Sequence, residues 1–554
     1  MDANAKTLIE AGDRLFSKRG NVMALWQQIA DNFYPERADF TVTRSDGREF
    51  ADNLSTSYPI LARRELGDGL GSMLRPTEKE WFYVETTRQD RIDTDGKKWL
   101  ERAGGTMRRA MYARASRFER ATKEGDHDFA AFGQTVISVQ MNKNYDDLLY
   151  RCWHLRDVAW CEDETGEIVE VHRKWKPYAR DAVKMFPKCS QSLRDRAERA
   201  PYDEVELRHV VILAENYSGA RPWKTKWVSL FIETDDATML EETGSRGRVY
   251  VIPRWQTASQ SQYAVSPATI IGLPDARLLQ AMTLTLIEAG ENYVRPPLIA
   301  VQDAIRSDIQ LFSGGITMVD AEYDEKLGAV LRPLTQDKSG MPIGRDLRND
   351  VREMLSRLFY LDKLTGPQIG DRPQMTAYEV AQRVQAYIRQ ALPLFGPMEQ
   401  NYNGEICEET FDLLLNGGAF GSTRDMPRSL LGNDIRFRFE NQLTETIGAQ
   451  KGTKLANAKQ LLAQVADVSP ESAYVVDWAA GFRDALEGER TPMDWMRSPE
   501  EAQAMSDQIK QAQQQQQLLA GMQQAANVAD TLGSAGHGLA KTAQAMPGAV
   551  GPVG

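Results

Sequence analysis

The sequence has little cysteine and little histidine, and neither residue type is clustered. Its four cysteines are far apart and form no Cys-X-X-Cys pair, and its five histidines are scattered along the chain. Because a structural zinc site needs closely spaced pairs of ligands, we expect no metal site. The sequence instead predicts free thiols in a protein that is assembled in a reducing cytoplasm. The four thiols are those of Cys152, Cys161, Cys189 and Cys407.

The chain also lacks the long apolar segments that direct proteins to membranes. Its first residues, Met-Asp-Ala-Asn-Ala-Lys, have no apolar core of the kind found in a secretory signal. No uncharged apolar run approaches the length of about twenty residues that crosses a bilayer. We therefore expect no membrane-spanning helix and no membrane partner.

Motifs of nucleotide binding and hydrolysis are missing too. The chain has no Gly-X-Ser-X-Gly and no His-Glu-X-X-His motif, and 448–454 resembles a phosphate-binding loop only superficially, with the wrong spacing. The glycines at positions 67, 69 and 71 follow no strand, so they indicate close packing between helices and not a dinucleotide site. We expect no cofactor.

One acidic cluster remains as a candidate for catalysis, because carboxylates can hold the two metal ions of a nuclease. The cluster consists of Glu162, Asp163, Glu164, Glu167 and Glu170. The Glu-Thr-Gly-Glu sequence within it is typical of a solvated turn, which is the interpretation we prefer. We therefore expect no catalytic residue. A metal-dependent, nucleic-acid-processing enzyme of a phage or mobile element is the alternative function.

The net charge of the chain is negative. It is −11 at pH 7, from 67 basic and 78 acidic residues. A protein that clamps DNA without sequence preference needs a basic surface, so this balance argues against that function. It fits a protein with many partners, or one that lets DNA pass without binding it tightly.

The chain has enough apolar residues, 42%, to build sizeable cores, and its first third is typical of helices. Apolar residues recur at helical spacing in two N-terminal stretches, and the second one ends before Pro35. We also expect helices over 56–74 and 95–132 and a strand over 134–140.

Residues from about 145 to 256 have a different sequence pattern, in which runs rich in β-branched residues or of alternating polarity are separated by polar turns. This pattern predicts a β-rich domain with one embedded helix near 178–198. The predicted strands lie within 167–175, 205–213, 226–233 and 247–252. Its tryptophans are expected in the core and not on a base-stacking surface. They are Trp153, Trp160, Trp175, Trp223, Trp227 and Trp255.

Two helices are then expected on either side of a short insertion. The first covers 273–293 and is stopped by Pro296-Pro297. The second covers 345–361, with an apolar stripe formed by Leu347, Val351, Met354, Leu355 and Leu358. The residues between them, 294–344, suggest a small α/β insertion.

The C-terminal part is predicted to be mostly helical. A polar loop at 362–375 precedes a helix over 376–418, which opens with the capping box of Thr376 and Glu379 and should kink at its prolines. Further helices are expected beyond 445, including one over 472–487. Residues 511–554 begin as a Gln-rich helix and end in a flexible Ala/Gly tail. The fold class is therefore α+β and predominantly helical.

Several short motifs occur in an order and spacing that extend over about residues 20–500. They are Trp26 to Pro35, 69–76 with Trp81-Phe82, 132–136, 253–255, 263–268, 273–275, 296–297, 375–380 with Arg383, and 394–397. In this order the chain resembles the head-to-tail connector, or portal, family of short-tailed, T7-like bacteriophages (podoviruses). Ala264 departs from the glycine that relatives often carry after the tyrosine, which affects only a local turn.

The resemblance implies a structural protein of the virion, with no enzymatic activity. Connectors of this family form rings, typically dodecamers, at one capsid vertex, where double-stranded DNA enters during packaging and leaves during ejection. Twelve copies at −11 each give about −132, which disfavours sticking to DNA. Another neck or adaptor protein is a further alternative, although such proteins are usually shorter.

The resemblance also implies a role for each segment. Residues 1–262 are the wing, 263–293 the first stem helix, 294–344 the clip, 345–361 the second stem helix, 362–375 a channel loop, 376–418 a long kinked wing helix, and 419–510 the crown. The clip docks the terminase large subunit and later the tail adaptor and tube. Major capsid and scaffolding proteins are further partners during capsid assembly in the host cytoplasm.

Four stem residues and two loop residues follow as site candidates. Leu347, Val351, Met354 and Leu358 are expected to pack against the neighbouring stem. Lys363 and Arg372 are expected to contact DNA phosphates in the channel, with salt bridges between subunits as the alternative.

Overall fold

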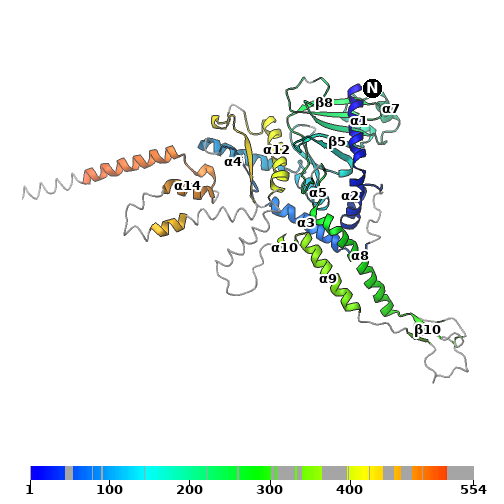
Figure 1. Ribbon diagram of the computed structural model, residues 1–554. Helices are drawn as coiled ribbons and strands as arrows, with labels where there is room; N and C mark the ends of the chain where they lie inside the picture. The colour runs from blue at the N-terminus through cyan, green and yellow to red at the C-terminus, as the bar shows by residue number, and fades with distance from the viewer. Residues whose placement is uncertain are drawn as a thin grey trace, which may run out of the picture. The chain divides into compact units, whose positions relative to one another are not determined.

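The computed structural model contains two compact units, whose helices and strands are shown in Figure 1. The first consists of residues 1–87, 102–426 and 433–447, and the second of 88–101, 427–432 and 448–554. The structure describes residues 2–43, 54–77, 79–88, 92–142, 144–220, 222–258, 261–300, 305, 309, 318, 331–333, 340–364, 396, 398–422, 425–440, 455–462, 477–488 and 491–520.

Two helices open the first unit, as the sequence predicted. They are α1 (Ala3–Lys18) and α2 (Gly20–Phe33), followed by the 3-10 turn η1 (Pro35–Arg37). The Asp2 carboxylate caps α1 by accepting a hydrogen bond of 3.0 Å from the Asn4 backbone N–H. The prediction that the second helix ends before Pro35 is confirmed.

The glycine-rich helix α3 (Tyr58–Leu74) lies against α5 (Phe118–Phe132). A Cβ atom on Gly67 would lie 2.3 Å from the His127 ring, and one on Gly71 would lie 2.9 Å from Oδ2 of Asp126. The close packing of helices that was predicted from these glycines is therefore confirmed, because no side chain fits in this space.

The single helix predicted over 95–132 is wrong, since the segment forms two helices. They are α4 (Thr94–Met111), which contributes residues to both units, and α5. The break follows from Ser116, whose hydroxyl bonds the carbonyl groups of Met111 and Ala113, and from Arg117, which has a positive φ of 56°. The Tyr150 backbone N–H also donates to the Ser116 carbonyl at 2.8 Å, a long-range contact that periodicity does not reveal.

The β-rich region contains two antiparallel sheets. The larger sheet has the order β4-β5-β6-β7-β8, and the smaller one has the order β3-β2-β9. Their strands are β2 (Val136–Met141), β3 (Leu148–Trp153), β4 (Val158–Glu162), β5 (Ile168–Trp175), β6 (Leu207–Leu213), β7 (Trp227–Glu233), β8 (Thr238–Ser245) and β9 (Tyr250–Val251). The turn η3 (Leu155–Asp157) precedes β4. The strands predicted at 134–140 and in the four runs are confirmed, while β3, β4 and β8 were not predicted.

Helices cover both faces of the larger sheet. Val210 and Ile212 pack with α1 on one face, whereas Leu207 packs with α6 (Ala179–Met185) and α7 (Gln191–Arg199) on the other. The one helix predicted near 178–198 is thus two helices, because Pro187 interrupts the segment and Ser190 caps α7 through the Leu193 backbone N–H.

The tryptophans of this region pack into the cores, as predicted. Trp160 and Trp227 are buried, and the other four are partly buried against the same apolar clusters. The main core joins this sheet to α2, α3, α5 and the helices that follow, with Trp26, Phe33, Phe129 and Phe132 among its largest members.

A small antiparallel pair, β1 (Phe82–Thr86) with β12 (Ile435–Phe439), connects residues about 350 positions apart. The strand β12 was not predicted, and it departs from the helical crown that the resemblance implies over 419–510, because Ile-Arg-Phe-Arg-Phe alternates as a half-buried strand does. The turn η6 (Arg428–Leu430) precedes this strand in the chain.

The remaining elements of the first unit are helical apart from one short ladder. They are α8 (Pro267–Val294), β10 (Leu298–Ala300), β11 (Leu331–Pro333), α9 (Gly340–Leu358), α10 (Leu361–Leu364), the π-helical turn η5 (Glu399–Gly404) and α12 (Glu405–Asn416). The end of α12 before Gly417-Gly418 confirms the predicted stop. The first part of the helix predicted over 376–418, with its capping box, lies outside the described residues.

The second unit includes α14 (Trp478–Gly488), the turn η8 (Met493–Trp495) and helices over 455–462 and 499–520. The Gln-rich helix expected from 511 is therefore present as far as residue 520. The Ala/Gly-rich tail lies outside the described residues.

A buried ion pair ties the start of the C-terminal helical region to α3 and α5. Arg75, which follows α3, pairs with Asp126 of α5 and donates a hydrogen bond of 2.7 Å to the Asn403 side chain in η5. Both charged side chains are only 4% exposed. Removal of one partner would leave a buried charge without compensation, so this pair fixes how η5 and α12 join the core.

Candidate functional site: a helical hairpin with an exposed apolar face

The hairpin of α8 and α9 begins at an anchor on α5. The hydroxyl groups of Ser266 and Thr269 donate hydrogen bonds of 2.8 and 2.6 Å to the carbonyl groups of Ala130 and Ala131. Pro267 occupies the first turn of α8, where its missing N–H costs nothing. The helix therefore begins six residues earlier than the predicted 273 and continues through Pro274.

The two helices pack side by side and run in opposite directions (Figure 1). Leu279 of α8 and Leu355 of α9 are fully buried, and a Cβ atom on Gly272 would lie 3.3 Å from the Leu355 side chain. Phe359, just after α9, stacks obliquely on Phe33 at 5.4 Å between ring centroids. The inner face of the hairpin thus belongs to the main core of the chain.

The far ends of the hairpin are held together by the short antiparallel pair of β10 and β11. Leu298 lies opposite Pro333, and Ala300 lies opposite Leu331. These strands are the base of the insertion predicted between the two helices. Most of that insertion lies outside the described residues.

The outer face of the hairpin carries large apolar side chains that the chain itself does not cover. They include Ile271, Leu278, Leu284 and Ile287 on α8, and Ile343, Leu347 and Met354 on α9, each of these seven between 47% and 62% exposed. Large apolar side chains that a folded chain leaves exposed are candidates for an interaction site. The sequence analysis missed the α8 members, although the apolar residues around the whole circumference of 278–287 were a visible signal.

Helix α8 is, among the described helices, the one long and apolar enough to cross a membrane by length and composition. The helix contains Asp275, Arg277, Glu288 and Glu291, so it has no uncharged apolar run of about twenty residues, and the absence of a membrane-spanning helix stays a prediction. One helix of this kind is weak evidence for a membrane, because core helices of soluble proteins pass the same test. Only 28% of its most apolar 18-residue stretch is buried within the chain.

The structure divides the predicted stem stripe into two halves. Val351 is 6% exposed, and Leu358 packs partly buried against the same core, so both face the chain's own interior. Leu347 and Met354 are 52% and 47% exposed and remain available to a neighbour. Packing of this helix against a neighbouring subunit stays a prediction. The predicted residues that remain available for such a contact are Leu347 and Met354, together with the exposed Ile343 on the same helix.

Of the two predicted DNA contacts, the structure describes one. Lys363 lies in the short helix α10, with its ammonium group 5.2 Å from the ring centroid of Tyr360. Tyr360 has a positive φ of 56° and separates α9 from α10, so the second helix ends at Leu358 and not at 361. Arg372 and the rest of the predicted channel loop from 365 onward lie outside the described residues.

The acidic cluster at 162–170 is used for local structure. Glu162 pairs with Arg254, and Oε1 of Glu170 lies 2.6 Å from Nε2 of the buried His172. Asp163 accepts hydrogen bonds from Thr165 and from the Glu167 backbone, and these bonds lower the pKa of Asp163. This arrangement matches the turn interpretation and supplies no convergent carboxylates for two metal ions.

Metal ligands do not converge elsewhere in the part of the chain that the structure describes, where groups of three or more His, Cys, Asp or Glu with suitable geometry are absent. The four cysteines are free thiols, of which Cys189 and Cys407 are buried. Burial raises the pKa of the Cys152 thiol well above its usual range, so this cysteine is protonated at neutral pH.

The chain belongs to the family of bacteriophage head to tail connecting proteins, which it matches over residues 5–493. This family consists of structural proteins of the phage particle. The resemblance that the sequence motifs suggested is therefore confirmed.

Two curated relatives carry the names of phage portal proteins. The chain is 25% identical over 503 residues to the probable portal protein of Bordetella phage BPP-1, with 87% of each chain covered. It is 21% identical over 490 residues to the portal protein of Salmonella phage epsilon15, with 86% of each chain covered.

Solved structures with partial similarity come from gene transfer agent particles. A chain of the native virion matches 75% of this chain and 87% of its own length, with 9% identity and a TM-score of 0.34. A chain of the neck of the empty particle matches 73% and 86%, with 9% identity and a TM-score of 0.35.

Proposed function

We propose that this protein is a portal subunit that assembles into a closed ring, with twelve copies as in related connectors, at one vertex of a phage capsid. Double-stranded DNA passes through the ring during packaging and ejection. The protein acts by assembly and has no enzymatic activity. Membership of the connector family and similarity to two phage portal proteins over most of the chain support this role.

The observation that carries the proposal is the outer face of the α8–α9 hairpin. Its exposed leucine, isoleucine and methionine side chains lie on two rigid helices that are anchored in the core. In a ring, one surface of each subunit contacts a different surface of the next, so such a face is covered without a membrane. Burial of a side chain such as Leu347 at the contact contributes about 1.5–3 kcal/mol.

The segments take the roles of a connector. Helices α8 and α9 form the stem, the insertion between them is the clip, and the β-rich region with the N-terminal helices is the wing. The loop after α10 lines the channel, and the C-terminal helices form the crown. The clip docks the terminase large subunit and later the tail proteins, while capsid and scaffolding proteins contact the ring as it assembles in the host cytoplasm.

Substitution of the exposed stem residues tests this proposal. Leu347→Asp and Met354→Asp should each reduce the fraction of protein in rings at least tenfold, because a carboxylate would be buried at the contact between subunits. Native mass spectrometry and negative-stain microscopy measure that fraction.

Asn349→Asp is the matched control, because it adds the same charge to the exposed polar side of α9 and should leave rings intact. Rings that form unchanged in both stem variants would refute the packing of α9 against a neighbour. Loss of rings in the control variant as well would show that charge on the helix, and not the apolar face, is responsible.

A further inference from the structure

Residues 102–123 carry a concentration of positive charge that is unusual for this acidic chain. They contain six arginines and one lysine but a single acidic residue, Glu119, while the chain as a whole has a net charge of −11. All of these residues lie in the first unit, on the end of α4, the turn after it and the start of α5. Charge is therefore separated within the chain, and a local surface can attract a polyanion that the average charge would repel.

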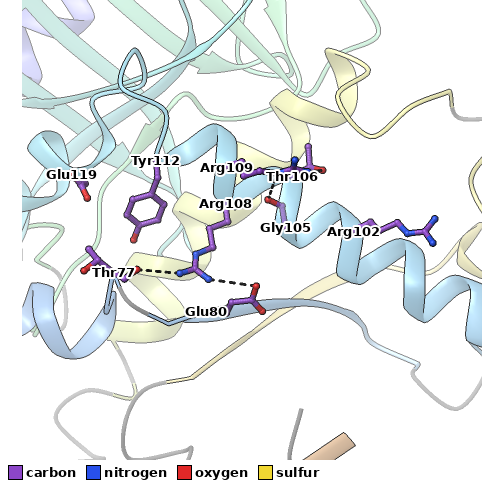
Figure 2. Close-up of a pocket in the computed structure, with 9 residues that line it drawn as sticks. All are labelled: Thr77, Glu80, Arg102, Gly105, Thr106, Arg108, Arg109, Tyr112 and Glu119. Atoms are coloured by element: carbon purple, nitrogen blue, oxygen red, sulfur yellow. Dashed lines mark hydrogen bonds and ion pairs between the residues drawn. The ribbon is translucent and has the colours of Figure 1, made fainter. Parts of the chain in front are cut away.

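Part of this surface is an open hollow beside α4 with a volume of about 830 Å³. Figure 2 shows Arg102, Gly105 and Arg109 along one side of the helix, while Arg108 reaches across to the Thr77 carbonyl and Glu80. The Tyr112 hydroxyl, also at the hollow, accepts a hydrogen bond of 3.0 Å from the buried Trp81 indole. The hollow is thus a fixed feature of the fold, lined by three guanidinium groups and two carboxylates.

A glycine inside α4 opens the hollow further. A Cβ atom on Gly104 would contact Val84 at 3.4 Å, so packing against β1 accounts for that residue. A Cβ atom on Gly105 would meet nothing within 4 Å. Glycine in the middle of a helix costs about 1 kcal/mol relative to alanine, and packing within the chain does not require it at this position. It allows an external group to approach the helix backbone between Arg102 and Arg109.

The turn between α4 and α5, and the strand beside it, carry further arginines. Arg114, Arg117 and Arg151 are exposed, and no ion pair joins them to a carboxylate in the part of the chain described by the structure. Arg151 follows Tyr150, whose backbone N–H binds the Ser116 carbonyl, so the β3 arginine lies beside the turn. Burial, and then the positive charges of Arg173 and Arg117, lower the pKa of Arg151. Arg117 and Arg151 therefore lie close enough for their positive charges to repel each other.

Backbone strain occurs at the same turn. Arg117 has a left-handed conformation, with φ 56° and ψ 26°, which costs a non-glycine residue about 1–2 kcal/mol. Strained residues concentrate at functional sites, where the surrounding structure enforces them.

We propose that Arg102, Arg109, Arg114, Arg117 and Arg151, the α4–α5 arginine surface, bind the phosphate backbone of duplex DNA without sequence preference and without enclosing the duplex. This DNA-binding proposal depends on the proposed function in one respect, which is that a portal subunit encounters DNA during packaging and ejection. Guanidinium groups bind phosphates in a bidentate manner, and several spaced arginines match a repeating polyanion.

The composition of the surface favours DNA over an acidic protein. Protein interfaces are built around apolar or aromatic anchors, whereas DNA interfaces are polar and strongly positive. Within 102–123, none of the large apolar side chains is exposed, although such side chains are exposed on many other elements. Salt screens electrostatic interactions beyond about 8 Å at physiological ionic strength. Acidic residues farther away therefore repel the DNA only weakly, and the nearby arginines determine the potential at this surface.

A covalently closed circular DNA tests the proposal, because it cannot thread the channel of a ring. Binding of labelled circular duplex to the purified full-length protein is measured by filter retention between about 50 and 200 mM salt. The triple variant Arg109→Glu/Arg114→Glu/Arg151→Glu should weaken binding at least tenfold. The slope of log K against log salt should fall by about one for each arginine that contacts a phosphate.

The control variant Lys184→Glu/Lys188→Glu/Arg199→Glu changes the net charge equally at exposed positions around α6 and α7, and should weaken binding less than twofold. The milder variant Arg109→Gln/Arg114→Gln/Arg151→Gln removes the positive charges without adding negative ones, so it perturbs folding less. It should also weaken DNA binding. Equal loss in the charge-matched control, or no loss in either arginine variant, would overturn the proposal. Arginine-dependent capture of a polyglutamate peptide without DNA binding would overturn it too, in favour of an acidic protein.

Ring formation in the same samples separates this inference from the proposed function. Rings whose circular-DNA binding does not depend on the arginines would refute the inference alone. Arginine-dependent binding by a chain that never forms rings would support the inference and refute the portal assignment.

Discussion

At the scale of single residues, the Asp39 side chain connects the segment after the N-terminal helices to the β-rich region. Its carboxylate oxygens lie 2.7 Å from Nε2 of His154 and 2.6 Å from Nη1 of Arg156. The Arg156 backbone N–H donates to Nδ1 of the His154 ring, so the ring proton is on Nε2 and faces Asp39. Burial opposes ionisation of Asp39, but the contacts with His154 and Arg156 outweigh it and lower the pKa to about 2.

This low pKa predicts how stability depends on pH. The unfolded carboxyl has a pKa of about 3.9, so the stabilisation by Asp39 is fully present above that pH and is lost as pH falls through about 2. Asp39→Asn should lower the free energy of unfolding at neutral pH by about 1 kcal/mol, a value that allows for partial exposure of the carboxylate to solvent. Urea unfolding at neutral pH and at acidic pH measures both effects.

The difference in stability between Asp39→Asn and the unmodified protein should shrink steadily as the pH is lowered. The exposed Glu10→Gln on α1 is the control and should show almost no difference at either pH. A difference for Asp39→Asn that stayed constant down to about pH 2 would contradict the assigned pKa.

At the scale of elements, one glycine joins α5 to the start of α8. Gly133 ends α5 with φ 74°, and its carbonyl accepts a hydrogen bond of 2.7 Å from the Trp255 backbone. A Cβ atom on it would lie 2.1 Å from the Val265 carbonyl carbon and 2.3 Å from the Ser266 nitrogen. Backbone atoms cannot move aside as a flexible side chain does, so any side chain here displaces the first turn of α8.

Gly133→Ala should therefore cost more than the left-handed backbone alone explains. We expect a loss of stability of at least about 3 kcal/mol, of which about 1–2 kcal/mol is conformational. Gly166→Ala is the matched control, because Gly166 has φ 84° but a Cβ atom there would meet nothing within 4 Å. Urea unfolding of both variants measures the difference, and equal costs would show that the contact with 265–266 does not constrain α8.

The sequence predicted those elements whose signals are local. The N-terminal helices have apolar residues at helical spacing and a terminating Pro35, and β5, β6 and β7 have β-branched runs between turns. The break at Arg117 and the β1–β12 pair were missed, because they depend on contacts between residues far apart in the chain. The same limit applies to the stem stripe, since periodicity identified the apolar face of α9 but not that Val351 faces the chain's own core and Leu347 faces outward.

The arginine surface was missed for a different reason. Every arginine in 102–123 was visible in the sequence, but the predicted continuous helix would have spread them around one cylinder. The turn at 112–117 and the contact with β3 bring Arg117 and Arg151 together. Net charge alone, at −11, argued against any DNA-binding surface.

At the scale of the whole molecule, the predicted channel segment 362–375, whose first residues lie in α10, should resist backward movement of DNA. Lys363 and Arg372 would be repeated around a ring, and their positive charges would contact phosphates transiently. Lys363→Glu/Arg372→Glu should reduce DNA retained in filled particles severalfold while ring assembly stays normal. Measurement of packaged DNA length in purified particles checks this result.

The surface variant Lys184→Glu/Lys188→Glu is the control and should retain DNA normally. Failure of the loop variant to form rings would mean that these residues make salt bridges between subunits instead. Unchanged retention in intact rings would refute the role of the loop.

The central claim is that this chain forms a closed portal ring, and one measurement tests it most directly. Native mass spectrometry of the purified full-length protein, with negative-stain images of the same sample, reports the number of subunits and the presence of a central hole. We predict a single predominant ring, most simply a dodecamer, whose subunits contact one another through the outer face of α8 and α9. Monomers or open filaments at concentrations where portal proteins are assembled would contradict it.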